Sequence, residues 1–247
     1  MSETVEKKQS SFAETVKVII QALLLALVIR SFLFQPFSIP SGSMIPTLLV
    51  GDYLFVSKYA YGCSRYSIPF SPNLFSGRIW SSEPKRGDIA VFRLPSNPKV
   101  DYIKRVIGLP GDRVQMIGGV LHINGEAVKR ERVGVFEGDT RASSSFPAQI
   151  YRETLPNGIS YDTLDRTPNS IGDNTREFLV PAGHFFMMGD NRDNSVDSRL
   201  DVGFVPLENF VGRAEIIFFS IGGGASPLEI WKWPTDLRVG RLFELTE

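Results

Sequence analysis

One apolar stretch near the N-terminus restricts the folds open to this chain more than any other feature. Residues 18–29 are apolar apart from Gln21, and with their apolar neighbours they approach the roughly 20 residues that span a bilayer. The basic residues Lys17 and Arg30 lie near the ends, where long side chains can reach the membrane surface. The stretch therefore favours a single membrane anchor, which we place at residues 16–35.

Two other interpretations of this stretch are open. A cleaved secretory signal needs an A-x-A site, but the stretch continues into Arg-Ser-Phe-Leu-Phe-Gln-Pro. A buried helix is the other alternative, and Pro36 and Pro40 would end any helix here. Arg30 is the only basic residue between the stretch and Lys58, so we expect residues 1–15 in the cytoplasm. The lysines that support this orientation are Lys7, Lys8 and Lys17.

Beyond residue 36 short apolar stretches alternate with Gly, Pro, Asn and Asp, which is typical of strands joined by turns. Asn124-Gly125 between two apolar runs predicts a hairpin. No long amphipathic helix is expected, so the pattern predicts a mostly β domain, built as coiled sheets or a partly open barrel. The predicted strands are 53–56, 89–92, 102–103, 106–107, 114–116, 120–123 and 215–219.

The composition changes again between residues 126 and 180, where charged residues, Ser, Thr and Asn dominate. Such composition indicates an inserted subdomain with long loops. We therefore divide the rest of the chain into a main β domain, residues 36–117 and 186–247, and an inserted β subdomain, residues 118–185.

Two segments, 63–80 and 218–233, are unusually apolar for loops. They either pack into the core or dip into the lipid interface, where Trp and Phe are favoured. The sequence leaves both interpretations open.

Composition excludes several kinds of site. Lys plus Arg is 27 and Asp plus Glu is 27, and this balance argues against a nucleic-acid binder held by phosphate contacts. The single cysteine, Cys63, permits neither an intrachain disulfide nor a cysteine-based zinc site. The two histidines, His122 and His184, do not make a strong metal cluster. No metal site is expected.

A candidate nucleophile lies just beyond the anchor. Pro40-Ser-Gly-Ser-Met-Ile-Pro-Thr47 places two serines around a glycine, which lets the backbone expose a neighbouring hydroxyl. Most such stretches are ordinary turns, and a serine nucleophile also needs a base. Neither His122 nor His184 has the context of a catalytic triad, so a lysine is the other candidate.

Lys104 has the setting that a lysine base requires. Strand alternation puts Tyr102 and Lys104 on one face, and Ile103 and Arg105 on the other. With an ordinary pKa of about 10.4, only about 0.04% of lysine is neutral at pH 7, so a base must be desolvated. An inward-facing Lys104 would be desolvated, whereas an outward charge on an edge strand is the commoner outcome of such a pattern.

Residues 189–199, Gly-Asp-Asn-Arg-Asp-Asn-Ser-Val-Asp-Ser-Arg, crowd charges, Asn and Ser directly after an apolar run. A surface loop looks like this, and so does a buried polar network at a site. Calcium loops are also rich in Asp and Asn, but arginines interrupt this segment and it lacks the Glu at position 12 of an EF-hand. A calcium site is therefore disfavoured.

The order of these segments carries more information than any one of them. Ser-Gly-Ser-Met-x-Pro-Thr-Leu-x-x-Gly-Asp at 41–52 resembles the nucleophile box of bacterial type I signal peptidases. The later boxes of that family are matched in the same order, at 85–89, 101–112, 189–199 and 203–206. With the anchor, the resemblance covers residues 16–217.

This resemblance implies a Ser-Lys serine endopeptidase that removes signal peptides from exported preproteins, without a metal or cofactor. Ser43 matches the nucleophile of the family and Lys104 its general base. Ser41 matches the serine whose hydroxyl, with the Ser43 backbone N–H, forms the oxyanion hole, and Ser195 matches the serine that orients the lysine. The matching supporting residues are Asp197, Arg199 and Arg105.

The resemblance also implies a specificity. Signal peptidases cut after small residues at the first and third positions before the scissile bond, and the substrate strand is expected to pair with strands near the nucleophile. The positions that match the pocket linings of the family are Phe37, Ile39, Pro40, Met44, Leu48, Leu54, Val91, Asp101, Tyr102 and Ile103.

Location and partners follow from the same resemblance. It implies a single-pass protein of the inner (plasma) membrane, with a cytoplasmic N-terminus and a catalytic domain on the periplasmic or extracytoplasmic side. The expected partners are signal peptides of preproteins emerging from the export machinery, and the lipid bilayer. We expect no nucleic acid and a monomer.

The chain departs from some relatives in having one anchor and no second cysteine, and neither departure touches the chemistry. Three alternatives stay open at this point. They are an autoprotease of the repressor type, a membrane-tethered scaffold with a decayed site, and a processing peptidase dedicated to one secretion or pilus substrate.

Overall fold

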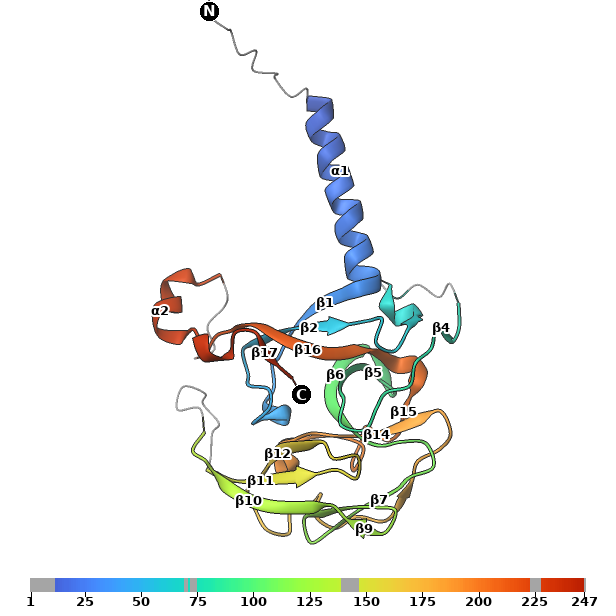
Figure 1. Ribbon diagram of the computed structural model, residues 1–247, viewed down its shortest axis with the longest axis vertical. Coiled ribbons are helices and arrows are strands. Elements are labelled where there is room, and N and C mark those ends of the chain that lie inside the picture. Colours follow the sequence, from blue (N-terminus) through green and yellow to red (C-terminus); the bar gives the residue numbers. More distant parts are fainter. Residues whose placement is uncertain (1–11, 69–70, 72–74, 139–146, 223–227, 247) are drawn as a thin grey trace, which may run out of the picture.

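The computed structural model describes residues 12–68, 71, 75–138, 147–222 and 228–246. Helix α1 (Phe12–Val28) and the π-helical turn after it (Ile29–Leu33) project from the β domain as a separate rod (Figure 1). The helix begins before the predicted start at residue 16 and gives way to a strand before Pro36. Predictions for the first eleven residues lie outside the described part of the chain.

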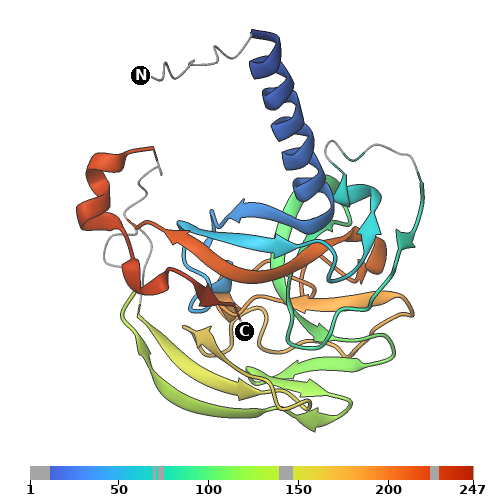
Figure 2. The same cartoon turned by 45° about the horizontal axis from the view of Figure 1, so that its top comes forward.

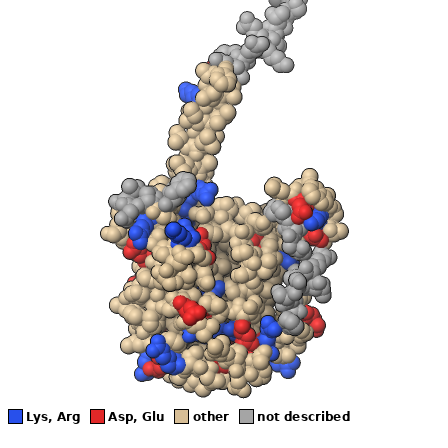
Figure 3. All heavy atoms as spheres, turned by 180° about the vertical axis from the view of Figure 1, so that it is seen from behind, with Lys and Arg blue, Asp and Glu red and all other residues tan. Residues whose placement is uncertain are grey.

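Helix α1 has the properties of a membrane span. Residues Phe12–Arg30 are long and apolar enough to cross a bilayer, and none of that window is buried in the protein. The space-filling view shows an almost uncharged surface along the helix (Figure 3). A helix that is apolar on all sides is stable where lipid or protein covers it, and here no protein does. The alternative of a buried soluble helix is therefore wrong.

The largest sheet is eight-stranded and antiparallel, in the order β1-β2-β16-β5-β6-β14-β15, with β17 paired to β16. In β2 the side chains alternate between buried and half-buried, the period of two expected of a strand with one face on a core. The strands are β1 (Phe34–Ser38), β2 (Asp52–Ser57), β5 (Ile89–Leu94), β6 (Asn97–Gly108), β14 (His184–Met188), β15 (Val205–Pro206), β16 (Phe210–Ser220) and β17 (Glu244–Leu245).

The large sheet coils without closing (Figure 2). Register shifts interrupt the pairing of β16 with both β2 and β5, and such bulges bend a strand and increase its twist. Among the described strands of this sheet, β1, β15 and the short β17 are each paired on one side only. This confirms the predicted mostly β, partly open architecture, in which the runs at 102–103 and 106–107 are parts of one strand, β6.

Smaller sheets complete the fold. They are β13-β7-β8-β9, β10-β11-β12 and β3-β4. Their strands are β3 (Cys63–Ser64), β4 (Arg78–Ile79), β7 (Arg113–Ile117), β8 (Val120–Ile123), β9 (Glu126–Ala127), β10 (Lys129–Phe136), β11 (Ala148–Thr154), β12 (Ser160–Asp165) and β13 (Phe178–Leu179). Beyond α1, the described helices are α2 (Trp233–Asp236) and single 3₁₀ turns.

The predicted hairpin is present between β8 and β9. Its turn residues Asn124 and Gly125 have φ of 56° and 85°, the left-handed conformation that such a tight turn requires. Strand β7 belongs to the main domain in our division at residue 118, yet it pairs with β8 in the smaller sheet. The division into a main domain and an insert stays a prediction.

Both apolar loop segments divide between core and surface. Tyr66 is buried, whereas Trp80 is 85% exposed. In the second segment Ile221 is buried, while Leu228 and Trp231 are 85% and 71% exposed. Each segment therefore contains buried and exposed residues, so neither core packing nor lipid contact describes a whole segment. Parts of both segments lie outside the described residues.

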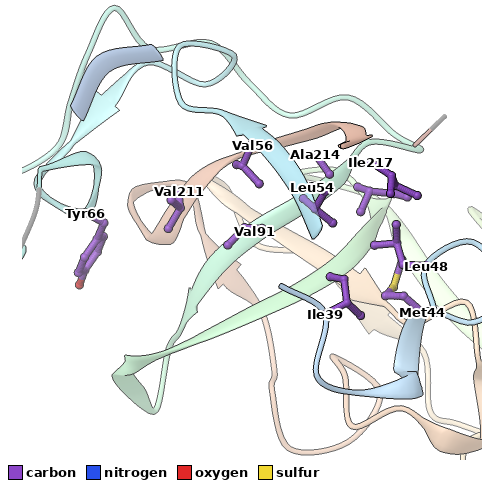
Figure 4. Packing of buried hydrophobic residues seen from close by; sticks show 11 residues of the cluster. Ile39, Met44, Leu48, Leu54, Val56, Tyr66, Val91, Val211, Ala214 and Ile217 are labelled. Carbon is purple, nitrogen blue, oxygen red and sulfur yellow. The ribbon is translucent and has the colours of Figure 1, made fainter. Parts of the chain in front are cut away.

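One apolar cluster supports the loop between β1 and β2 (Figure 4). Met44 and Leu48 of that loop are buried and pack with residues of β2, β5 and β16. Because burying each such side chain stabilises a fold by roughly 1.5–3 kcal/mol, these two residues anchor the loop to the sheet beneath it. The cluster also includes Ile39, Leu54, Val56, Tyr66, Ile89, Val91, Val211, Ala214 and Ile217.

Candidate active site

Ser43 lies in a single 3₁₀ turn, Gly42–Met44, within the loop between β1 and β2. The turn is fixed from both sides. Met44 anchors it in the apolar cluster, and Asn191 holds it from the opposite segment. The Asn191 side-chain amide donates to the Gly42 carbonyl at 2.9 Å, and its backbone N–H donates to the Ser43 carbonyl at 3.1 Å. The serine side chain is therefore presented by a rigid turn.

Lys104 reaches Ser43 from strand β6, which lies between β5 and β14 in the interior of the sheet. Its side chain is 4% exposed, so the alternative of an outward charge on an edge strand is wrong. The Nζ atom lies 2.6 Å from Ser43 Oγ and 3.0 Å from the Ile103 carbonyl oxygen. The structure thus brings the two predicted dyad residues into hydrogen-bonding contact.

Burial changes the protonation of Lys104. Desolvation lowers the pKa of its ammonium from 10.5 to about 8, against the opposing charges of Asp197 and Asp190. With a pKa of about 8, about a tenth of the lysine is neutral at pH 7, against about 0.04% for an ordinary lysine. A buried lysine of this kind can accept a proton from the serine that it contacts.

Ser43 and Lys104 open onto a pocket of about 480 Å³. Seven of the ten residues predicted to line it do so: Phe37, Ile39, Pro40, Val91, Asp101, Tyr102 and Ile103. Met44, Leu48 and Leu54 are absent from the lining and lie in the apolar cluster instead. Ser41 is exposed on the pocket wall, in extended backbone conformation.

Three further residues line the pocket that the sequence reasoning did not name as lining, namely Ser38, Asn194 and Val196. Asn194 and Val196 belong to the polar segment 189–199, which had been singled out as a possible network but not as a wall. Ser38 follows Phe37 in β1 and has no distinguishing signal in the sequence.

The segment 189–199 folds behind the dyad as a buried ion-pair network. Arg199 Nη2 and Nε both lie 2.9 Å from carboxylate oxygens of Asp197, and the Gly189 N–H donates to the same carboxylate at 3.0 Å. Burial alone raises the pKa of Asp197, but Arg199 and these hydrogen bonds outweigh it and leave the pKa lowered. The carboxylate is therefore charged and neutralised locally.

Ser195 is close to the dyad but is not bonded to it. Its side chain is buried and helps to lower the pKa of Asp197. The hydroxyl nevertheless makes no well-formed hydrogen bond to any described atom. Gly189 lies between it and the nucleophile turn. A Cβ atom at Gly189 would lie 2.2 Å from Ser195 Oγ and 2.5 Å from the Ser43 carbonyl oxygen, so only glycine fits.

Arg105, the third supporting residue, is completely buried beside the dyad lysine. Its guanidinium binds Asp190 with both arms, at 2.9 and 2.8 Å, and Asp190 also accepts a hydrogen bond from Thr47 at 2.6 Å. Desolvation opposes the charge of Arg105, but Asp190 raises its pKa overall. Sequence reasoning had named neither Asp190 nor Thr47, although both lie within the quoted boxes.

Within the described residues, no three His, Cys, Asp or Glu side chains are arranged to hold a metal ion. The groups gathered at the pocket are a serine, a lysine of lowered pKa and a set of paired charges. This arrangement supplies a nucleophile and its base, as acyl transfer requires.

The sequence of this chain is similar to that of one known family over nearly its whole length. The family model for signal peptidase, peptidase S26, matches residues 12–219. Signal peptidase I of Rickettsia typhi is 41% identical over 260 residues, covering 98% of this chain and 94% of the relative. Signal peptidase I of Rickettsia akari is 42% identical over 236 residues, covering 89% of this chain and 87% of the relative. A crystal structure of a signal peptidase I from Enterococcus faecalis is 29% identical and covers 53% of this chain, with a TM-score of 0.32.

Proposed function

Because this chain belongs to the signal peptidase I family, peptidase S26, we propose that Ser43 is its nucleophile and Lys104 its general base. As a member it is a serine endopeptidase that removes signal peptides from preproteins by a Ser-Lys dyad. The observation that carries the residue assignment is the 2.6 Å contact between a buried lysine and a buried serine at the pocket.

The proposed reaction proceeds through an acyl-enzyme. Neutral Lys104 accepts the Oγ proton of Ser43 as Oγ attacks the scissile carbonyl carbon, and the resulting ammonium donates that proton to the leaving amine. A water molecule then attacks the ester carbonyl while Lys104 accepts its proton. The proton returns to Ser43 Oγ, and the signal peptide leaves with a free carboxylate.

The negative oxygen of each tetrahedral intermediate needs donors that are in place beforehand. We assign this role to the Ser41 hydroxyl and the Ser43 backbone N–H. Ser41 is suited to it because it is exposed on the pocket wall, two residues from the nucleophile. We assign Ser195 to orienting Lys104, because it is buried beside the Ser43 turn and its hydroxyl has no other partner among the described residues. We assign the pair of Asp197 and Arg199 to supporting the segment that carries Ser195. Replacing Ser41 with Ala should lower kcat; an unchanged kcat would argue against this assignment.

The pocket supports selection of small side chains. It is lined mainly by aliphatic and aromatic groups, and large substrate side chains would clash with these walls. Strand β1 is an open edge of the large sheet, so its free backbone groups are available to a substrate strand. A series of peptides with Ala, Val and Phe before the cut tests this, and equal cleavage of all three would contradict it.

We propose a membrane arrangement with α1 spanning the inner membrane, residues 1–15 in the cytoplasm and the catalytic domain outside. The lysines before α1 support this orientation. The helix leaves the molecule at the end opposite the β10-β11-β12 sheet, and α2 lies toward the α1 end (Figures 1 and 2). The exposed Leu228 and Trp231 beside α2 are suited to contact the lipid interface.

The orientation is tested by adding protease outside spheroplasts, which should digest the catalytic domain. Full protection of that domain would refute the orientation.

The dyad is tested by cleavage of a purified preprotein with an A-x-A site in detergent micelles. Ser43→Ala and Lys104→Met should both abolish cleavage, with the wild-type cut placed after A-x-A by mass spectrometry. Lys99→Met is the matched control, because Lys99 is exposed on the same strand, and it should cut like wild type. Cleavage by either dyad variant at wild-type rate would show that the assignment is wrong.

A further inference from the structure

A second buried network joins the three-stranded sheet to the catalytic segment. Glu153 of β11 is fully buried and lies outside the pocket that Ser43 and Lys104 line. A carboxylate is costly to bury unless it is paired and hydrogen-bonded. Both arms of the Arg192 guanidinium donate to it, at 2.7 and 2.6 Å, and the Tyr161 hydroxyl donates at 2.9 Å. Glu153 is therefore fully engaged, and its partner lies in the segment behind the dyad.

Arg192 is connected to the turn that carries Ser43 through its sequence neighbour Asn191. Arg192 follows Asn191, whose backbone and side chain hold the carbonyls of Ser43 and Gly42. The Arg192 carbonyl also accepts a hydrogen bond from Arg199 Nη2 at 2.7 Å. Arg192 is thus fixed at its side chain by Glu153 and at its backbone by Arg199. The position of Asn191, and with it the Ser43 turn, depends on both attachments.

The same sheet also contacts the lysine side of the dyad. The Tyr161 ring of β12 lies 4.2 Å from the guanidinium carbon of Arg105, which directly follows Lys104 in β6. Arg105 in turn binds Asp190, and the Asp190 carbonyl accepts a hydrogen bond from the Leu164 N–H of β12 at 2.9 Å. One sheet therefore braces the immediate neighbours of both catalytic groups.

We propose that Glu153 is a positioning residue for the catalytic serine: acting through Arg192 and Asn191, it holds the Ser43 turn within reach of Lys104. The inference rests on the proposed assignment of the Ser43–Lys104 dyad. The two-armed bond of a carboxylate to a guanidinium fixes orientation as well as distance, which an apolar contact does not. A misplacement of about 1 Å at a reacting group can reduce turnover by about 100-fold.

The first test compares Glu153→Gln with Asp162→Asn in cleavage of the A-x-A preprotein. Asp162 is the matched control, because it lies beside Tyr161 in β12 and pairs with Arg152 on the exposed face, at 2.8 Å. We expect Glu153→Gln to lower kcat by about tenfold or more with KM changed by less than about twofold, and Asp162→Asn to leave both unchanged. An equal loss in the two variants would overturn the proposal.

A combined variant separates positioning from stability. Glu153→Leu and Arg192→Met, combined with Tyr161→Phe so that no buried hydroxyl loses its partners, replace the network by apolar groups of similar volume. Such an exchange often preserves or raises stability. The proposal predicts an unfolding temperature near that of wild type with kcat still low. Recovery of kcat together with stability would overturn it, because the network would then be structural only.

A third variant shows which proposal has failed if the results disagree. Ser43→Ala is measured in the same assay. If Ser43→Ala still cuts, the dyad assignment itself is wrong. If Ser43→Ala is inert while both Glu153 variants turn over at the wild-type rate, the dyad stands and the positioning role of Glu153 is refuted.

Discussion

At the residue scale, the pKa of Lys104 depends on the balance between its burial and its two acidic neighbours. Asp190 and Asp197 both favour the charged ammonium, but each is bound by an arginine, Arg105 and Arg199 respectively. Desolvation is nevertheless the largest effect, so the pKa of Lys104 falls to about 8. Burial therefore outweighs both carboxylates in setting the pKa of Lys104.

The pH dependence of cleavage follows from this pKa. Only neutral Lys104 accepts the serine proton, so kcat/KM should rise with pH and level off above a midpoint of about 8. The measurement is kcat/KM on a soluble peptide between about pH 6 and pH 10. A profile that is flat across that range would be inconsistent with Lys104 as the base.

The lowered pKa of Lys104 should also make the stability of the fold depend on pH. The pKa of Lys104 is about 8 when folded and 10.5 when unfolded, so the unfolded chain binds more protons between these values. Lys104 therefore destabilises the fold below about pH 8, and this cost disappears as pH rises through about 10.5. The difference corresponds to at most about 3 kcal/mol.

Lys104→Met should accordingly be inactive but more stable than wild type at pH 7, by about 1–3 kcal/mol in the free energy of unfolding. The gain should shrink as pH is raised toward 10.5. Urea unfolding at several pH values measures it, with the exposed Lys99→Met as control. A variant less stable than wild type at pH 7 would contradict this account.

At the scale of elements, the C-terminal segment holds the loop that carries Ser43. Arg241 Nη2 donates to the buried Asp52 carboxylate at 2.7 Å and to the Thr47 carbonyl at 2.9 Å. Asp52 in turn accepts the Leu49 N–H at 2.8 Å. The loop between β1 and β2 is thus attached to the apolar cluster on one side and to a C-terminal arginine on the other.

Arg241→Met should weaken this attachment. Removing one partner of a buried charge costs about 1–3 kcal/mol, so we expect a lower unfolding temperature and a reduced kcat. Glu244→Gln is the control, because Glu244 pairs with Arg241 at 3.2 Å but is half exposed, and such pairs are worth about 0–1 kcal/mol. Equal effects of the two variants would show that the Asp52 contact contributes nothing special.

At the scale of the whole molecule, the anchor and the β domain are separable. No residue of α1 is buried, and the domain core is built from strands and loops that begin at β1. The helix therefore contributes location rather than folding energy. We propose that its effect on catalysis is to concentrate the site near signal peptides that lie in the same membrane.

A chain that begins at Arg30 should fold and cut. Its unfolding temperature should match that of the full chain, because the core loses no contact, and a soluble A-x-A peptide should be cleaved at an unchanged rate. Cleavage of a preprotein inserted in vesicles should fall by about tenfold or more, since effective concentration is lost. A truncated chain that fails to fold would show that α1 stabilises the domain.

The chemistry of the candidate site could be predicted from the order of short motifs along the chain. Ser43 and Lys104 could be named because their segments, each weak alone, follow one another in the order of a known family. The hairpin at Asn124-Gly125 could be predicted because its turn requires left-handed backbone. The three pocket residues that proved to be core, Met44, Leu48 and Leu54, could not be separated from the walls, because an apolar side chain looks the same in sequence whether it faces a pocket or packs beneath it.

What the sequence determined by itself is local: an apolar helix, strands of period two, and the candidate residues for the chemistry. What only the tertiary structure decided is which distant segments meet. Glu153 carries no signal in the sequence, yet it lies against Arg192 behind the dyad. The lowered pKa of Lys104 likewise arises from burial among residues that are distant in the sequence, against the charges of Asp190 and Asp197. Burial and charge pairing are sums over neighbours in space, and a chain read in order does not reveal those neighbours.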